Sequence, residues 1–221
     1  MSALDALRAR LRPTQGAGSA FPSIEEELGP YRHLFKGRVL NAGSGSRDLS
    51  ALVDGELVNQ DIHTGDNPPE HVHILAPLDA IPVEDGSFDV VICNAVLEHV
   101  LDPEAVVGEL SRVLRPGGTL YLCVPFMQPE HLDPTDSQRY AAPGLRALCE
   151  RHGLDVCEVT AVHPVETTLA WVVYEWLREE DRIPVLLAGR LWLWWLLRTA
   201  PGSRRQVHAL ASAYRAIATK R

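Results

Sequence analysis

The sequence is short of positive charge and of paired cysteines. Its 21 Lys and Arg face 29 Asp and Glu, and the formal net charge is −8. Proteins that bind nucleic acids normally do so through a basic surface, so we expect neither DNA nor RNA as a partner. The four cysteines contain no C-x-x-C pair, and Cys93 and Cys123 lie inside apolar runs. This pattern favours reduced, packed thiols.

The N-terminal segment 1–12 lacks the continuous apolar stretch of a secretory signal, so a cytoplasmic location is expected. A chain of 221 residues is long enough for one large α/β domain and short for two. With 46% hydrophobic and 23% charged residues, the composition is that of an ordinary globular protein. One hydrophobic core is therefore expected.

What the chain does contain is an alternation of apolar runs and helix signals, which is typical of a doubly wound α/β sheet. Asp102 suits the N-cap of one helix and Pro103 its first turn, and Pro116-Gly-Gly118 marks its end. Further helices are expected at 3–11 and 143–152. Strands are expected at 38–41, 57–62, 71–75, 88–94, 119–124, 154–161 and 213–219.

One turn has the character of a ligand site. The first apolar run ends in Asn41-Ala-Gly-Ser-Gly45, where the missing Cβ atoms allow backbone amides to approach a ligand. The helix start that should follow favours a carboxylate group. Asp61 ends the second apolar run, at about the distance where a ribose diol meets a carboxylate in dinucleotide-type sites.

Four blocks, at 37–46, 58–62, 85–100 and 110–118, occur in an order that resembles the class I S-adenosylmethionine-dependent methyltransferases of the type 11-like family. The resemblance covers residues 38–162, and the last run, 214–219, fits the family's antiparallel final strand. It implies a Rossmann-like sheet of seven strands, mostly parallel. It also implies S-adenosyl-L-methionine as cofactor and a small-molecule acceptor, such as a sugar or a natural-product intermediate.

The resemblance also implies which residues hold the cofactor. The chain departs from the family at Asn41, where an acidic residue is usual, and at Pro77, where many relatives place an acid for the adenine amino group. Asp79 can substitute for that acid. The implied cofactor residues are Asn41, Ala42, Gly43, Ser44, Gly45, Asp61, Ile62, Leu78 and Asn94.

The acceptor end is expected near the loop that follows Asn94 and near the segment 124–140. Glu98, Arg139 and Tyr140 are predicted to contact the acceptor. His99 and His131 are the predicted catalytic bases, because imidazole exchanges protons near neutral pH. The alternative for Glu98 and His99 is a plain helix-start role.

His131, Asp133, Asp136 and Arg139 could bind a metal or the polar groups of a substrate. No metal is predicted, because no second His or Cys completes a four-ligand set. The alternative is a structural network in which Asp136 and Arg139 pair as helix neighbours. His71 and His73 are expected to be ordinary surface or core histidines.

Four segments are predicted: an N-terminal helix and arm at 1–30, a cofactor-binding core at 31–165, a helical insert at 166–207 and a final strand at 208–221. The insert holds a tryptophan-rich run that Arg190 interrupts, which argues against a transmembrane span. It is expected to be a pair of helices over the sheet or against a second subunit, as in a homodimer. Interfacial membrane contact and a substrate lid are the alternatives.

Three other functions use some of the same residues. A nicotinamide dehydrogenase is disfavoured, because its fingerprint needs a third glycine where this chain has Asp48. A non-catalytic partner or regulatory protein that keeps the fold stays open, since fold does not fix function. A cyclase that uses the cofactor's charge without methyl transfer also stays open.

Overall fold

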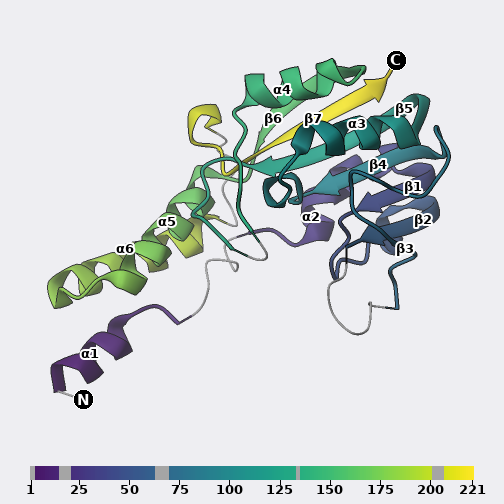
Figure 1. Ribbon diagram of the computed structural model, residues 1–221. Helices are drawn as coiled ribbons and strands as arrows, with labels where there is room; N and C mark the ends of the chain where they lie inside the picture. The colour runs from purple at the N-terminus through teal and green to yellow at the C-terminus, as the bar shows by residue number, and fades with distance from the viewer. Residues whose placement is uncertain (1–2, 15–20, 63–69, 133–134, 201–206) are drawn as a thin grey trace. The chain divides into compact units, whose positions relative to one another are not determined.

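Seven strands form one sheet in the order β3-β2-β1-β4-β5-β7-β6 in the computed structural model, which describes residues 3–14, 21–62, 70–132, 135–200 and 207–221. The central strand β4 is buried at all but one residue and β1 is buried over its last four residues, as expected of strands covered on both faces. Figure 1 shows the order across the sheet. The strands are β1 (Lys36–Ala42), β2 (Asp54–Asp61), β3 (Ile74–Leu75), β4 (Phe88–Asn94), β5 (Leu114–Pro125), β6 (Leu154–Val162) and β7 (Ala213–Lys220).

Strands β1 to β5 are parallel, and the last strand runs the other way. Lys220, at the end of β7, donates from Nζ to the carbonyl of Leu114 at the start of β5, at 2.7 Å. The amide of Arg221 donates to the carbonyl of Gly153, just before β6, at 3.0 Å. The predicted fold class, a mostly parallel Rossmann-like sheet with an antiparallel final strand, is confirmed.

The helices of this unit begin and end where local chemistry dictates. In α3 (Pro103–Val113) the Asp102 side chain accepts from the amide of Ala105 at 3.0 Å, as the predicted N-cap should. Helix α4 (Ala142–Arg151) carries Pro143 in its first turn and is followed by Gly153 at φ +73°. The remaining short helices are α2 (Ile24–Leu28), η2 (Gly29–Leu34), η3 (Ser50–Leu52) and η4 (Leu97–His99).

Two strands differ from their predicted bounds. Strand β5 already begins at Leu114, so Pro116-Gly-Gly118 lies within the strand instead of between helix and strand. Its pairing with β4 shifts register between Phe88 and Val90, and a proline is tolerated at such an irregularity. Strand β3 is only Ile74–Leu75, and His71 and His73 lie outside it.

A second compact unit comprises 1–22, 127–130 and 161–213, of which the described residues form α1 (Ala3–Leu11), α5 (Val165–Glu179), α6 (Ile183–Thr199) and η6 (His208–Leu210). The predicted pair of helices in the insert is present as α5 and α6. They pack through a cluster of Ala170, Val173, Leu177, Leu186, Leu193 and Leu196.

Two further features hold this unit together. A Cβ at Gly189 would lie 2.4 Å from Leu177, so glycine permits the close approach of α5 and α6. Arg190 donates to the carbonyl of Leu11 at 2.9 Å and thereby fixes the end of α1. Among the described residues, no helix combines the length and the apolar character that crossing a bilayer requires.

Candidate functional site

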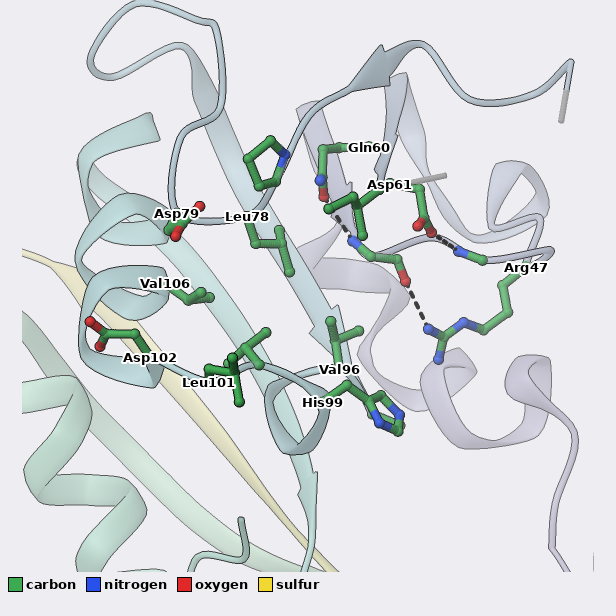
Figure 2. A pocket seen from close by; sticks show the side chains of 16 residues that line it. Arg47, Gln60, Asp61, Leu78, Asp79, Val96, His99, Leu101, Asp102 and Val106 are labelled. Atoms are coloured by element: carbon green, nitrogen blue, oxygen red, sulfur yellow. Dashed lines mark hydrogen bonds between the residues drawn. The ribbon is translucent and has the colours of Figure 1, made fainter. Parts of the chain in front are cut away.

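A cavity of about 670 Å³ opens at the carboxyl ends of β1, β2 and β4, within the unit that holds the sheet. This is the edge where doubly wound folds bind ligands, and the volume lies in the ordinary range of small-molecule sites. Figure 2 shows the side chains around it. The lining residues are Gly43, Gly45, Arg47, Gln60, Asp61, Ile62, Pro77, Leu78, Asp79, Ala95, Val96, His99, Val100, Leu101, Asp102 and Val106.

The glycine turn after β1 forms one wall of the cavity. Gly43 and Gly45 have φ of +66° and +54°, a left-handed backbone that glycine adopts without strain. The amide of Gly43 donates to Gln60 Oε1 at 2.9 Å, and the amide of Gly45 donates to Asp61 Oδ2. Both ends of the turn are therefore held by side chains of β2.

Gln60 is a structural part of this site that the sequence analysis missed. It is fully buried, and its Nε2 donates to the carbonyl of Ala76, just before Pro77 and Leu78. One side chain thus joins the glycine turn to the opposite wall of the cavity. No clear signal marked it, because β2 is rich in polar residues and Asn59 is a second amide beside Gln60.

Of the predicted cofactor residues, Gly43, Gly45, Asp61, Ile62 and Leu78 line the cavity. The others lie behind that surface. Asn41, Ala42, Ser44 and Asn94 are buried and do not line it.

Asn41 shows what such a buried position does. Its Nδ2 donates to Asn59 Oδ1 at 3.0 Å, so it joins β1 to β2 beneath the turn.

Arg47 is the second residue that the sequence analysis missed. Its Nη2 donates to the carbonyl of Gly43 at 2.8 Å, and its Nη1 donates to the carbonyl of Asn94. The guanidinium lines the cavity, as Figure 2 shows, and joins the turn after β1 to the end of β4. A fixed positive charge at this point suits a carboxylate group.

A second cluster lies around η4. Glu98 is 1% exposed, and its Oε1 lies 3.7 Å from His99 Nε2 and 3.8 Å from His131 Nε2. The two imidazole rings meet edge to face with centroids 5.6 Å apart. The structure thus brings together both predicted bases and one predicted acceptor contact. His99 belongs to the cavity wall, whereas Glu98 and His131 do not.

Comparison with known proteins shows which family this chain resembles. A family model described as a methyltransferase domain matches residues 46–122. This segment begins directly after Gly45 of the glycine turn and includes β2, β4 and most of β5. The resemblance inferred from the sequence motifs is therefore confirmed.

Curated relatives match the chain over part of their length. The chain is 32% identical over 127 residues to an uncharacterised 37.1 kDa protein of transposon TN4556 from Streptomyces fradiae, covering 55% of this chain and 33% of that protein. It is 29% identical over 130 residues to the ubiquinone biosynthesis O-methyltransferase of Xanthomonas campestris pv. campestris, covering 59% and 50%. The chain therefore spans between a third and a half of these relatives.

Solved structures share the methyltransferase fold. Phosphoethanolamine N-methyltransferase 2 of Haemonchus contortus, in complex with S-adenosyl-L-methionine, matches with a TM-score of 0.55 at 14% identity, covering 97% of this chain and 60% of that one. At this identity the likeness supports the fold alone.

Neighbouring groups hold His99 and His131, the two histidines of the cluster around η4, in place. His99 Nδ1 contacts the carbonyl of Thr135, and His131 Nδ1 lies 3.5 Å from Asp136 Oδ2. The amide of His131 donates to the same carboxylate oxygen at 2.9 Å. Arg139 binds both oxygens of Asp136 and holds the pKa of that carboxyl below its ordinary value.

Two residues predicted to contact the acceptor have partners within the chain. Arg139 pairs with Asp136, which is the structural alternative weighed from the sequence. Tyr140 donates from its hydroxyl to Gln138 Oε1 at 3.0 Å, and burial raises its pKa. Asp133 lies outside the described residues.

His71 and His73 have the ordinary roles that were expected, although both contact residues in or directly beside the cavity wall. His71 Nε2 lies 2.7 Å from the carbonyl of Gly45. His73 Nδ1 accepts from the amide of Asn59 at 2.9 Å. They brace the glycine turn and β2 against the segment before β3.

Proposed function

We propose that this chain is an S-adenosyl-L-methionine-dependent methyltransferase that acts on a small molecule. The observation that carries the proposal is the cavity at the carboxyl edge of the sheet, in which a glycine turn and Asp61 face the same space. Its volume of about 670 Å³ suits a nucleoside-sized ligand together with part of an acceptor. The sequence relatives named as methyltransferases support the same conclusion.

The residues present fit this cofactor. Asp61 offers a carboxylate for the ribose diol, and Leu78 with Asp79 lies where the adenine would be held. Arg47 offers a guanidinium to the carboxylate of the methionine part. The backbone carbonyl of Asn94, to which Arg47 Nη1 already donates, has a second lone pair for the ammonium group of the methionine part.

When bound, the cofactor supplies a sulfonium methyl group that is already activated. The chain's part is then to align the acceptor with that methyl and to keep water out, and alignment alone can supply several kcal/mol of the acceleration. Leu101, Val100 and Val106 provide the apolar wall for this purpose. A hydroxyl or ammonium acceptor must also lose a proton, and the cluster of Glu98, His99 and His131 is where we place that event.

Calorimetry with S-adenosylhomocysteine tests the cofactor site. We expect Asp61→Ala to weaken binding at least ten-fold, because the ribose diol loses its acceptor and Gly45 loses its hydrogen bond. Asp54→Ala, at the exposed opposite end of β2, is the matched control and should bind like the wild type. Equal affinity of the Asp61→Ala variant and the wild type would overturn the assignment.

Mass spectrometry of reaction products tests the activity and separates the alternatives. Methyl transfer adds one methyl group to the acceptor and converts the cofactor to S-adenosylhomocysteine. Cyclisation leaves the mass of the substrate and the cofactor unchanged. A regulatory protein binds cofactor or partner without any product.

A second candidate function is contact with an anionic membrane surface, and the exposed face of α6 favours it. Trp192, Trp194 and Trp195 are 44–54% exposed on this helix. The helix contains Arg190 and Arg198 and no acidic residue, and aromatic rings beside basic groups suit a lipid interface. Because Arg198 stacks over Trp194, charge and ring are presented together.

Flotation with vesicles tests this contact. We expect the full chain to float with vesicles that contain anionic lipids and to be released by salt. The triple variant Trp192→Gln, Trp194→Gln, Trp195→Gln should stay in solution, whereas the control Trp171→Phe, in α5, should not change flotation. Absence of flotation together with a dimeric mass by light scattering would show that the face belongs to a homodimer instead.

A further inference from the structure

Three side-chain atoms that all act as electron-pair donors converge beside the cavity. One ligand atom from each of Glu98, His99 and His131 lies within 4.8 Å of the other two. We propose that these three residues bind a divalent transition-metal ion such as Zn²⁺. The proposal concerns metal binding by this cluster and does not depend on the methyl transfer proposed above.

Glu98 is the first observation that points to a cation. Its side chain is 1% exposed, and neither carboxylate oxygen has a hydrogen-bond partner among the described residues. A buried carboxylate without partners is costly, and such groups are normally paired or bound to a metal. Among the described residues, only the imidazole groups of His99 and His131 lie within ion-pair distance of the Glu98 carboxylate.

The orientation of the two imidazoles is the second observation. His99 Nδ1 faces the carbonyl of Thr135, and His131 Nδ1 faces the carboxylate of Asp136. Both oxygens are acceptors, so each Nδ1 faces a group that accepts its hydrogen, and in the neutral tautomer each Nε2 carries the lone pair that a metal would use. In that tautomer the two Nε2 lone pairs and the Glu98 carboxylate face one another, and a cation between them makes the arrangement favourable.

The same orientation is what metal-binding histidines usually show. One ring nitrogen faces the metal, and the other donates to a carboxylate or a backbone carbonyl that fixes the ring. Asp136 is itself held by both guanidinium nitrogens of Arg139, so the support extends one residue further. The two imidazole rings are therefore held in this orientation by Thr135, Asp136 and Arg139, which lie outside the proposed metal position.

Distances and ligand types agree with a transition metal. Zn–N and Zn–O bonds of about 2.0–2.2 Å in a tetrahedron separate neighbouring ligand atoms by roughly 3.3–3.6 Å. The separations of 3.7 Å and 3.8 Å between Glu98 Oε1 and the two Nε2 atoms require only a small inward movement, and the ligand atoms of the two histidines lie within 4.8 Å of each other. Two imidazoles with one carboxylate form a three-ligand set that leaves one position open, as in catalytic zinc sites.

The open coordination position would face the cavity, because His99 belongs to both the cluster and the cavity wall. An acceptor oxygen bound in the cavity could occupy it. A metal-bound hydroxyl loses its proton more readily, so a bound acceptor oxygen would become a better nucleophile. A coordinated imidazole has no lone pair left for a proton. The proposal therefore makes His99 and His131 ligands in place of the predicted bases.

Metal titration of the full-length chain, after dialysis against a chelator, tests the proposal. We expect Zn²⁺ to bind with a stoichiometry of one and Co²⁺ to give the visible absorption of a site with mixed nitrogen and oxygen ligands. His131→Gln and Glu98→Gln should each weaken Zn²⁺ binding at least a hundred-fold. His33→Gln, which changes an exposed histidine outside the cluster, is the matched control and should bind like the wild type.

A second variant keeps the test decisive if ligand variants fold poorly. Asp136→Asn leaves all three ligands in place, and we expect it to weaken Zn²⁺ binding roughly ten- to a hundred-fold, the range found for such supporting groups. S-adenosylhomocysteine affinity, measured on the same samples, should stay near that of the wild type. No saturable Zn²⁺ binding, or equal binding by wild type and His131→Gln, would overturn the metal site while leaving the methyltransferase proposal intact.

Discussion

A side chain at Gly43 would collide with Val96, because an ideal Cβ at that position lies 2.6 Å from both γ-methyl carbons of Val96. Gly43 also has a φ of +66°. The contact joins the turn after β1 to the loop after β4, so two walls of the cavity are fixed against each other. The absence of a side chain at Gly43 is therefore a packing requirement as well as a backbone requirement.

Gly43→Ala should therefore be much more harmful than the same change at Gly45. The left-handed backbone costs about 1 kcal/mol for a non-glycine residue, and overpacking adds about 1–3 kcal/mol. Gly45 has φ +54° but no heavy atom within 4 Å of the added Cβ, so Gly45→Ala should cost only about 1 kcal/mol. Urea unfolding measures both. The double variant Gly43→Ala, Val96→Ala should recover the overpacking part, and no recovery would contradict this account.

The fold was predictable because its signals are local. The apolar run of β4 and the Asp102-Pro103 start of α3 each follow from neighbouring residues alone. Strand β3 was overestimated because two residues of pairing with β2 give no periodicity that a sequence can reveal. The early start of β5 was missed because proline and glycines normally end elements, and here a register shift accommodates them.

The site was only partly predictable, for a different physical reason. Gly45 and Asp61 belong to neighbouring strands whose ends share an edge, so motif order placed them together. Arg47 could not be found in this way, because its role depends on two carbonyls that come from different strands. The partnership of His99 with His131 could not be found either, because His99 belongs to η4 and His131 follows β5, and only the fold brings their rings and the buried Glu98 together.

The cysteines provide a prediction about reactivity. Cys93, Cys123 and Cys149 are buried, and Cys157 is exposed. Burial raises the pKa of Cys93 and of Cys149 to about 12, so at mildly alkaline pH these thiols carry almost no reactive thiolate. We expect iodoacetamide to label Cys157 alone in the native protein and all four in urea, as read by peptide mass spectrometry. Rapid native labelling of Cys149 would contradict the packing of α4.

Gln60 provides a prediction about the cavity walls. Gln60→Leu keeps the size of the side chain but leaves the amide of Gly43 and the carbonyl of Ala76 without their partner. We expect a loss of about 2–3 kcal/mol in the free energy of unfolding and weaker S-adenosylhomocysteine binding. Gln128→Leu is the control. It removes one hydrogen bond, from Gln128 to the Ser212 hydroxyl outside this cavity, and should leave cofactor binding unchanged.

The last prediction concerns the pH dependence of stability near α3. Arg112 binds the carboxylate of Glu109 and donates to the carbonyls of Val83 and Ile81 at 2.8 Å and 2.9 Å. Glu109 Oε1 also accepts from the amide of Ile81 at 2.7 Å. The hydrogen bond from Arg112 is the main cause that lowers the pKa of Glu109 below its ordinary value of 4.5. This small network attaches the segment before β4 to α3.

Arg112→Met should lower the free energy of unfolding by about 2 kcal/mol near neutral pH. The carboxylates of Glu109 and Asp85 and the carbonyls of Val83 and Ile81 lose their donor, while both ion pairs are partly screened by solvent. Since the folded pKa of Glu109 lies below the unfolded value, the contribution of its charge is complete above that value and is lost as pH falls through the folded pKa. The urea midpoints of wild type and Arg112→Met should therefore differ most near neutral pH and approach each other below about pH 4. A constant difference across that range would mean that Arg112 stabilises α3 through its packing and its carbonyl contacts, and not through the charge of Glu109.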